Sequence, residues 1–122
     1  EDVFSRDINL DLPAAHLLVN TSNDAWFGDT LAPHQHLEIA RMRALETARP
    51  MVRSTNTGSS AFIDYKGRIL SATGQFTTET LTHSVQGRTG ATPFIVFAKI
   101  QPFLSALIIL LMLFFLWRRR RA

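Results

Sequence analysis

The sequence predicts an α/β or α+β domain followed by one transmembrane helix, on three observations. Short apolar runs bounded by proline, glycine, asparagine or aspartate surround one amphipathic stretch within residues 1–92. An apolar run then covers residues 94–117 with a single charged side chain, Lys99. Four consecutive arginines follow at 118–121. We therefore expect a layered sheet domain attached to a membrane span.

The first predicted elements are a strand and a helix. Residues 16–20 form an apolar run after Pro13 and predict a buried strand. A helix is predicted over residues 33–49, because proline is favoured in a first helical turn and Pro50 cannot continue a helix. Its predicted apolar stripe comprises Leu37, Ala40, Ala44, Leu45 and Ala48, and its polar side Glu38, Arg41, Glu46 and Arg49.

Four short strands are predicted after this helix, at residues 51–54, 60–64, 68–71 and 79–85. The second and third would form a hairpin, in which Asp64 opens the turn and Gly67 takes the left-handed conformation. Gly58 precedes this hairpin and is expected to relieve a close approach between strands. Residues 87–93 predict a flexible linker to the membrane.

The apolar run is long enough to cross a membrane. Its 24 residues would extend for about 36 Å as a helix, against a hydrocarbon core of about 30 Å. Lys99 can reach the nearer interface, and Pro102 marks a kink or the start of the helix. Trp117 and the arginines form an interface anchor, which places the C-terminus in the cytoplasm and residues 1–92 in the periplasm of a bacterial cell.

Charge and cysteine content exclude several classes of partner and chemistry. The net charge is +3, but residues 1–92 carry eight basic and ten acidic side chains, so a nucleic-acid-binding surface is not indicated. The sequence has no cysteine, which removes disulfides, zinc–thiolate sites and a thiol nucleophile from this chain. The sequence opens at Glu1 without an initiator methionine or a signal-like segment, so we expect a piece of a longer protein.

Two polar groups are weak candidates for chemistry. His34 and His36 form a His-x-His pair, but their rings would point about 200° apart on a helix, so no metal site is predicted and both are expected to be solvent-facing or loop residues. His16, Ser22 and Asp24 could be written as a hydrolase triad, but no G-x-S-x-G elbow surrounds the serine.

The loop at residues 22–28 is a stronger candidate. Trp26 and Phe27 lie beside Asp24 and Gly28, in a loop that follows a predicted strand. Binding sites in α/β sheets favour the carboxyl ends of strands. The two aromatic side chains could equally form a hydrophobic plug.

Two segments of the chain carry a family resemblance. They are LLVNTSNDAWFG at residues 17–28 and HQHLEIARMRALETARPMVRSTNTGSSAFIDYKGRI at residues 34–69. Both resemble the C-terminal part of the apolipoprotein N-acyltransferases, a membrane family of the nitrilase, or carbon–nitrogen hydrolase, superfamily. NDAWFG, ARMRALE and R-x-TN-x-G are specific motifs of this family. GQFTTETL, the linker, the span and the basic tail extend the resemblance over nearly the whole chain.

The resemblance implies part of a nitrilase-like αββα sandwich over residues 1–86, a linker at 87–93, one transmembrane helix at 94–117 and a basic cytoplasmic tail at 118–122. It also implies the bacterial inner membrane and a Glu–Lys–Cys triad. The cysteine would take an acyl chain from a phospholipid as a thioester and pass it to the diacylglyceryl-cysteine of a lipoprotein. The bilayer is a further expected partner, and no cofactor or metal ion is implied.

On this alignment the catalytic triad lies upstream of the chain. The sequence EDVF looks like the family's continuation of a Cys-Tyr pair, so Glu1 matches the glutamate of Cys-Tyr-Glu, whereas Lys66, in a predicted turn, does not match the triad lysine. The resemblance places near the active site Glu1, Asn23 and Asp24, and in a substrate-binding loop Trp26, Phe27 and Gly28. The chain alone is expected to be inactive and to require the N-terminal part of the same protein.

Two other functions stay open on the sequence. A membrane-anchored amidohydrolase of the nitrilase type would use the same triad with water as the acceptor. A non-catalytic, single-span interaction protein would consist of these 122 residues alone. Further hydrophobic spans upstream would favour the acyltransferase over the hydrolase.

Overall fold

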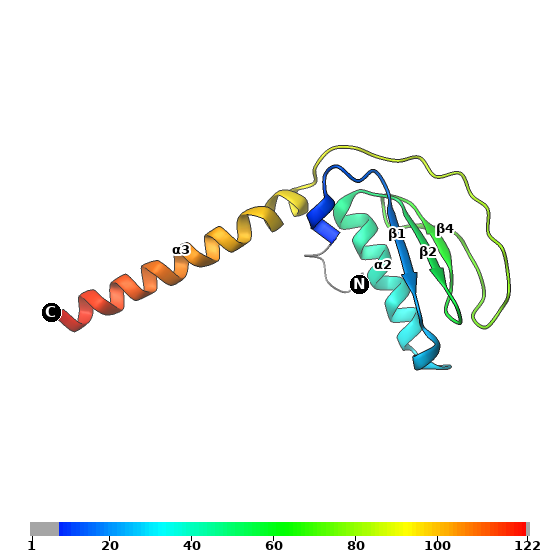
Figure 1. Ribbon diagram of the computed structural model, residues 1–122, viewed down its shortest axis with the longest axis horizontal. Helices are drawn as coiled ribbons and strands as arrows, with labels where there is room; N and C mark the ends of the chain where they lie inside the picture. Colours follow the sequence, from blue (N-terminus) through cyan, green and yellow to red (C-terminus); the bar gives the residue numbers. More distant parts are fainter. Residues whose placement is uncertain (1–7, 122) are drawn as a thin grey trace.

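The computed structural model describes residues 8–121 and contains a sheet domain with one long helix extending from it (Figure 1). The elements in chain order are η1 (Asn9–Asp11), β1 (Leu18–Ser22), η2 (Ala25–Phe27), α2 (Ala32–Thr47), β2 (Met51–Thr55), β3 (Ala61–Ile63), β4 (Ile69–Ala72) and α3 (Pro93–Arg121). The predicted α/β domain followed by one long apolar helix is confirmed.

The sheet is mixed, with the strand order β1-β2-β3-β4. β1 and β2 are parallel, with Leu18 opposite Met51 and Ser22 opposite Thr55. The β2–β3 and β3–β4 pairs are antiparallel. A parallel pair needs a crossover, and α2 supplies it between β1 and β2. The carboxyl ends of both strands consequently lie at the same edge of the sheet.

α2 covers one face of the sheet (Figure 1). Alternate residues of β2 and β3 face it and are buried, and the small side chains of α2 allow the helix to approach closely. The core consists of Ala40, Ala44, Met51, Ala61 and Ile63, with Leu18 and Leu37 packed against it. The predicted stripe is therefore correct at its centre, whereas Leu45 is half exposed.

The prediction of a strand over residues 79–85 is wrong. This segment is extended but lies over the face of the sheet opposite α2, where residues 79–81 line a pocket with Val52, Ser54 and Phe62. His83 packs its ring 5.5 Å from that of Phe62. A segment that crosses a sheet face is not placed to form a backbone ladder with an edge strand, so residues 79–85 do not form a strand.

Arg49 is buried, which corrects its predicted place on the polar side of the helix. α2 ends at Thr47, and Ala48 adopts a left-handed conformation with φ of +50°, so Arg49 leaves the helical pattern. Its side chain is 1% exposed. The guanidinium donates hydrogen bonds to the carbonyl oxygens of Pro13, Ala15, Thr47, Ala48 and Gly90. Burial, and second the charge of Arg88, lowers the pKa of Arg49.

The segment predicted as a flexible linker is bound to the domain. The Arg88 backbone N–H donates to the carbonyl of His16 at 2.8 Å. Thr92 Oγ1 donates to the carbonyl of Glu46 at 2.6 Å and accepts from the Ile95 N–H at 3.3 Å. Ile95 is 1% exposed. These contacts fix the start of α3 against the C-terminal end of α2.

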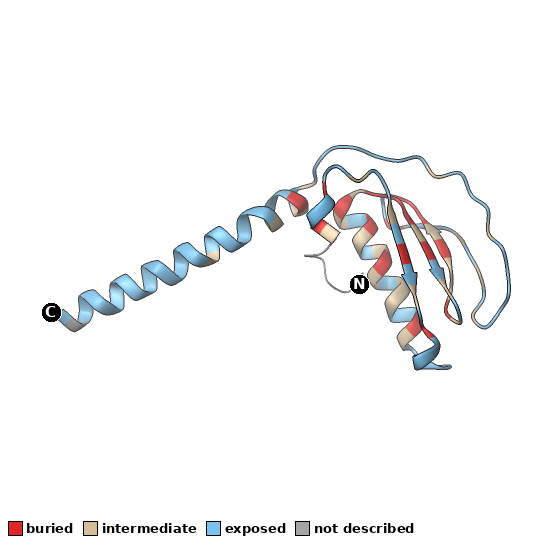
Figure 2. Cartoon of the chain, viewed as in Figure 1, coloured by how far each residue is buried: buried red, intermediate tan, exposed pale blue. Residues whose placement is uncertain are grey.

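α3 is long and apolar enough to cross a membrane over Pro93–Arg119, with a mean hydropathy of 2.3. The helix is continuous through Pro102, so its start is Pro93. Figure 2 shows that α3 is exposed along most of its length. An apolar surface of this extent requires lipid or other apolar partners.

The β3–β4 turn rests on α2 through Gly67, whose φ is +72° as predicted. A Cβ atom at Gly67 would lie 2.9 Å from the carbonyl oxygen of Arg41. The Asp64 carboxylate accepts hydrogen bonds from the backbone N–H groups of Lys66 and Arg68, each at 2.8 Å, and from the Arg68 guanidinium. Burial raises the pKa of Asp64, but the hydrogen bonds from Arg68 and Lys66 and the charge of Arg68 outweigh it, so the pKa is lowered.

We expect the domain to lose stability in acid, because Asp64 stabilises it only while its carboxylate is ionised. Because its folded pKa is depressed, its contribution is fully present above the unfolded pKa of about 3.9 and is lost as the pH falls through the folded value. Amide exchange of β3 and β4, followed in detergent micelles from neutral pH into this acid range, measures the effect. Asp64→Asn should flatten the pH dependence relative to Asp11→Asn, which alters an exposed carboxylate; equal slopes in the two variants would contradict the assignment.

Candidate functional site

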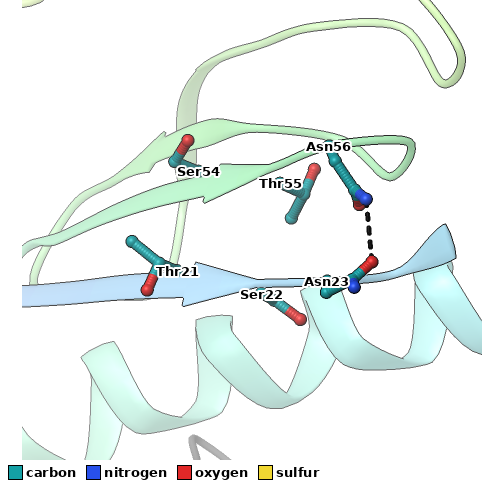
Figure 3. Close-up of a pocket in the computed structure, with 6 residues that line it drawn as sticks. All are labelled: Thr21, Ser22, Asn23, Ser54, Thr55 and Asn56. Carbon is teal, nitrogen blue, oxygen red and sulfur yellow. Dashed lines mark hydrogen bonds between the residues drawn. The ribbon is translucent and has the colours of Figure 1, made fainter.

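The candidate site lies where the parallel strands β1 and β2 end. Ser22 pairs with Thr55, so the residues that follow them, Asn23 and Asn56, reach the same edge of the sheet. The Asn56 amide donates to Asn23 Oδ1 at 2.7 Å (Figure 3). The Asp24 backbone N–H donates to Asn56 Oδ1 at 3.1 Å. These bonds join the two loops at the position that α/β folds use for ligand sites.

A shallow, open pocket of about 580 Å³, lined by polar residues, lies at this edge. Its lining comes from both strands and the residues just after them, as Figure 3 shows: Thr21, Ser22, Asn23, Ser54, Thr55 and Asn56. Hydroxyl and amide groups can donate and accept hydrogen bonds but carry no charge. A lining of this kind is suited to binding a polar group through hydrogen bonds.

Asp24 is the centre of the site, and its side chain is fully buried. Oδ1 accepts the hydroxyl hydrogen of Ser22 at 2.7 Å and lies 3.3 Å from His36 Nδ1. Oδ2 accepts from Arg53 Nη2 at 3.0 Å. Arg53, also buried, donates through Nη1 to Asn20 Oδ1 at 2.7 Å. A buried carboxylate requires such partners, and here they come from β1, α2 and β2.

Gly58 allows the β2–β3 loop to approach this carboxylate. A Cβ atom at Gly58 would lie 2.3 Å from Asp24 Oδ2, a distance that no real contact permits. A close approach at Gly58 is thus present, but its partner is the Asp24 side chain and not a neighbouring strand. A larger residue at this position would displace the carboxylate or the loop.

The loop after Asp24 is an ordered turn, η2. Asn23 Oδ1 accepts the Ala25 N–H at 3.2 Å, and the carbonyl of Asp24 accepts the Phe27 N–H at 3.1 Å. Gly28 follows with φ of +56° and ψ of −151°, a conformation that favours glycine. The backbone of the turn thus explains why asparagine precedes it and glycine follows it.

The two aromatic residues of the turn have different surroundings. Trp26 is 85% exposed, whereas Phe27 packs against His36 with ring centroids 5.1 Å apart and planes at 73°. Phe27 is itself 38% exposed, so neither aromatic side chain is buried as a hydrophobic plug would be. Trp26 presents a large apolar surface to the surroundings of the domain.

The structure brings together five of the predicted site residues, Asn23, Asp24, Trp26, Phe27 and Gly28, in one turn. Glu1 lies outside the described residues. His16 lies at the opposite end of β1, where its carbonyl accepts the Arg88 N–H, so it forms no triad with Ser22. Within residues 8–121, no group of three or more histidine, aspartate or glutamate side chains is placed to hold a metal ion.

The predicted position of His36 is wrong. It was predicted to face solvent or lie in a loop, but it lies on α2 in contact with Asp24 and Phe27, while His34 is exposed. The same Asp24 oxygen contacts both Ser22 and His36. A carboxylate between the serine and the histidine leaves no imidazole to accept the serine proton, so the three do not form a hydrolase triad.

Sequence reasoning also missed Arg53 and Asn56 as members of the site. Both belong to the motif R-x-TN-x-G, but neither was assigned to the site, although an arginine within a strand signals a buried partner of opposite charge. Asn56 follows β2 as Asn23 follows β1, and this matching position after two neighbouring parallel strands was the available signal.

We expect Asp24→Asn to destabilise the domain by about 2 to 3 kcal/mol, because the amide removes the negative charge that accepts from Arg53 and His36. Amide exchange over β1 and β2 in micelles measures the loss. Asp29→Asn, which alters an exposed carboxylate in the same loop, is the matched control. Equal exchange in the two variants would refute the central role of the buried charge.

Curated proteins named apolipoprotein N-acyltransferase are similar to this chain over much of its length. One from Nitrosomonas europaea is 54% identical over 99 residues, which are 81% of this chain and 20% of the relative. One from Pasteurella multocida is 50% identical over 78% of this chain and 18% of its own length. One from Ralstonia nicotianae is 46% identical over 100% of this chain and 24% of its own length. The chain thus spans about a fifth to a quarter of these relatives.

The carbon–nitrogen hydrolase family profile matches residues 4–94, from before η1 to the start of α3. The match includes the whole sheet, the helix that covers it and every described residue of the candidate site. The chain therefore belongs to the carbon–nitrogen hydrolase family.

Proposed function

We propose that this chain is the C-terminal segment of an apolipoprotein N-acyltransferase of the bacterial inner membrane. The observation that carries the proposal is Trp26, an exposed aromatic residue on a turn held by Asp24, in a domain whose next element is an apolar helix. An enzyme that acts on soluble amides needs neither the exposed tryptophan nor the apolar helix, whereas an enzyme that acts on lipids can use both to contact them. The names of the similar curated proteins support the same function.

The proposed reaction is acyl transfer in two steps. A cysteine thiolate attacks the ester carbonyl of a phospholipid, so that a thioester forms and a lysophospholipid leaves. The amine of a diacylglyceryl-cysteine then attacks the thioester, and the thiolate leaves. A glutamate would take the amine proton, and a lysine would stabilise the oxyanion. This chain has no cysteine, so the thiolate would belong to another part of the whole protein.

The residues of this chain would bind and position rather than react. Both carboxylate oxygens of Asp24 already accept hydrogen bonds within the domain, so Asp24 would shape the turn together with Asn23. Trp26 would contact the acyl chains of the substrates, while Phe27 and Gly28 complete the turn that presents it. Glu1 is proposed to lie near the cysteine, as the family resemblance implies.

The proposed arrangement in the membrane follows from α3. Residues 1–86 would form the periplasmic part of the domain, 87–93 the connection, 94–117 the span and 118–122 the cytoplasmic tail. The Arg121 guanidinium lies 3.9 Å from the centre of the Trp117 ring, a pair suited to an interface anchor. The phospholipid donor, the lipoprotein acceptor and the bilayer would be the partners of the whole protein.

The test is acyl transfer from a labelled phospholipid to a diacylglyceryl-lipopeptide by the whole membrane protein. We expect transfer through a hydroxylamine-sensitive adduct, and no adduct on the 122-residue chain alone, because it has no thiol. Trp26→Ala should lower kcat/KM about tenfold, because it removes an apolar contact surface. Trp26→Phe should retain most of the wild-type kcat/KM.

Trp117→Phe is the control for the loss of a tryptophan, since this residue lies at the far end of α3. Release of ammonia from amides without acyl transfer would favour the amidohydrolase. Transfer that is insensitive to Trp26→Ala would remove the proposed role of the turn.

A further inference from the structure

His36 touches both ends of the turn that carries Trp26. Its Nδ1 lies 3.3 Å from Oδ1 of Asp24, the residue just before η2, and its ring packs edge-on against Phe27, the last residue of η2. The His36 side chain is only 24% exposed, so most of its surface is enclosed. Trp26 lies between the two residues that His36 contacts.

The chemistry of Asp24 fixes how His36 binds it. Both Asp24 oxygens accept, one from Ser22 and the other from Arg53. An ionised carboxylate has no hydrogen to donate, so the proton of the His36 contact is on Nδ1. Its Nδ1–H therefore donates to Oδ1.

The turn depends on such outside contacts for its position. η2 is three residues long, and its backbone hydrogen bonds are those of Phe27 to Asp24 and of Gly28 to Ala25. A single 3₁₀ turn is weakly held by its own bonds. α2 is a rigid support by comparison, because Ala40 and Ala44 are fully buried against the sheet.

We propose that His36 is a positioning residue that sets where Trp26 stands relative to the lipid substrates. It transmits the fixed position of α2 to the turn through one hydrogen bond and one ring contact. This inference rests on the proposed function for its effect on catalysis, but its effect on the turn is independent of that function. His36 itself touches no reacting atom.

Two substitutions separate the two contacts. His36→Asn keeps an amide donor near the place of Nδ1 and removes the ring that packs on Phe27. His36→Phe keeps a ring and removes the donor, which leaves Asp24 Oδ1 with Ser22. His34→Asn, at an exposed position two residues earlier on the same helix, is the matched control.

The experiment measures amide exchange and lipid-substrate kinetics on the same whole protein in membranes. We expect His36→Phe to speed exchange at Phe27 and Gly28 and to raise KM for phospholipid about tenfold, as the loss of a hydrogen bond to a charged group implies. The value of kcat should stay nearly constant, and His36→Asn should recover most of the loss. His34→Asn should match the wild type.

Unchanged exchange at Phe27 and Gly28 in His36→Phe would overturn the inference, whatever the activity. Faster exchange that spreads equally over β2 and β3, or a fall in kcat without a change in KM, would show a general structural role and would also overturn it. Absence of acyl transfer by the wild-type protein would instead refute the proposed function, and the exchange result would still decide whether His36 holds the turn.

Discussion

The buried carboxylate of Asp24 is the constraint on which the candidate site depends. A charge removed from water is stable only if its partners are close and correctly oriented. Ser22, His36 and Arg53 meet this demand from three different elements, and Gly58 leaves room for the carboxylate. The end of β1, the start of α2 and the middle of β2 are therefore fixed relative to one another at one point. The turn η2 begins at that point.

α2 connects this point to the membrane helix. Near its first residues His36 contacts the turn, and at its last turn the carbonyl of Glu46 accepts from Thr92, while Arg49 just beyond it binds the carbonyl of Gly90. A helix of 16 residues is about 24 Å long. The position of Trp26 relative to the start of α3 is consequently set by packed structure rather than by a free linker. Under the proposed function, such preorganisation would reduce the entropy lost on substrate binding.

Local signals in the sequence were sufficient for most of the fold. Pro33 lies in the first turn of α2, Pro50 follows its end, and Gly67 takes the left-handed position expected of it. The sequence could not show that residues 79–85 cross the face of the sheet, because strand pairing depends on where the whole fold places a segment. Arg49 was misplaced because helix periodicity was continued one residue past the left-handed Ala48.

The residues of the candidate site also divide into those that local sequence signals predict and those that they do not. The NDAWFG turn was found because it is contiguous in the sequence, whereas His36 and Arg53 join it only through the crossover of α2.

The central claim is that this turn holds Trp26 against lipid. Its most direct measurement places a benzophenone side chain at position 26 of the whole protein, in bilayers with labelled phospholipid, with exposed Met42 of α2 as the reference position. We expect labelled lipid to be captured at position 26 and not at position 42; equal capture at both, or none at 26, would contradict the account.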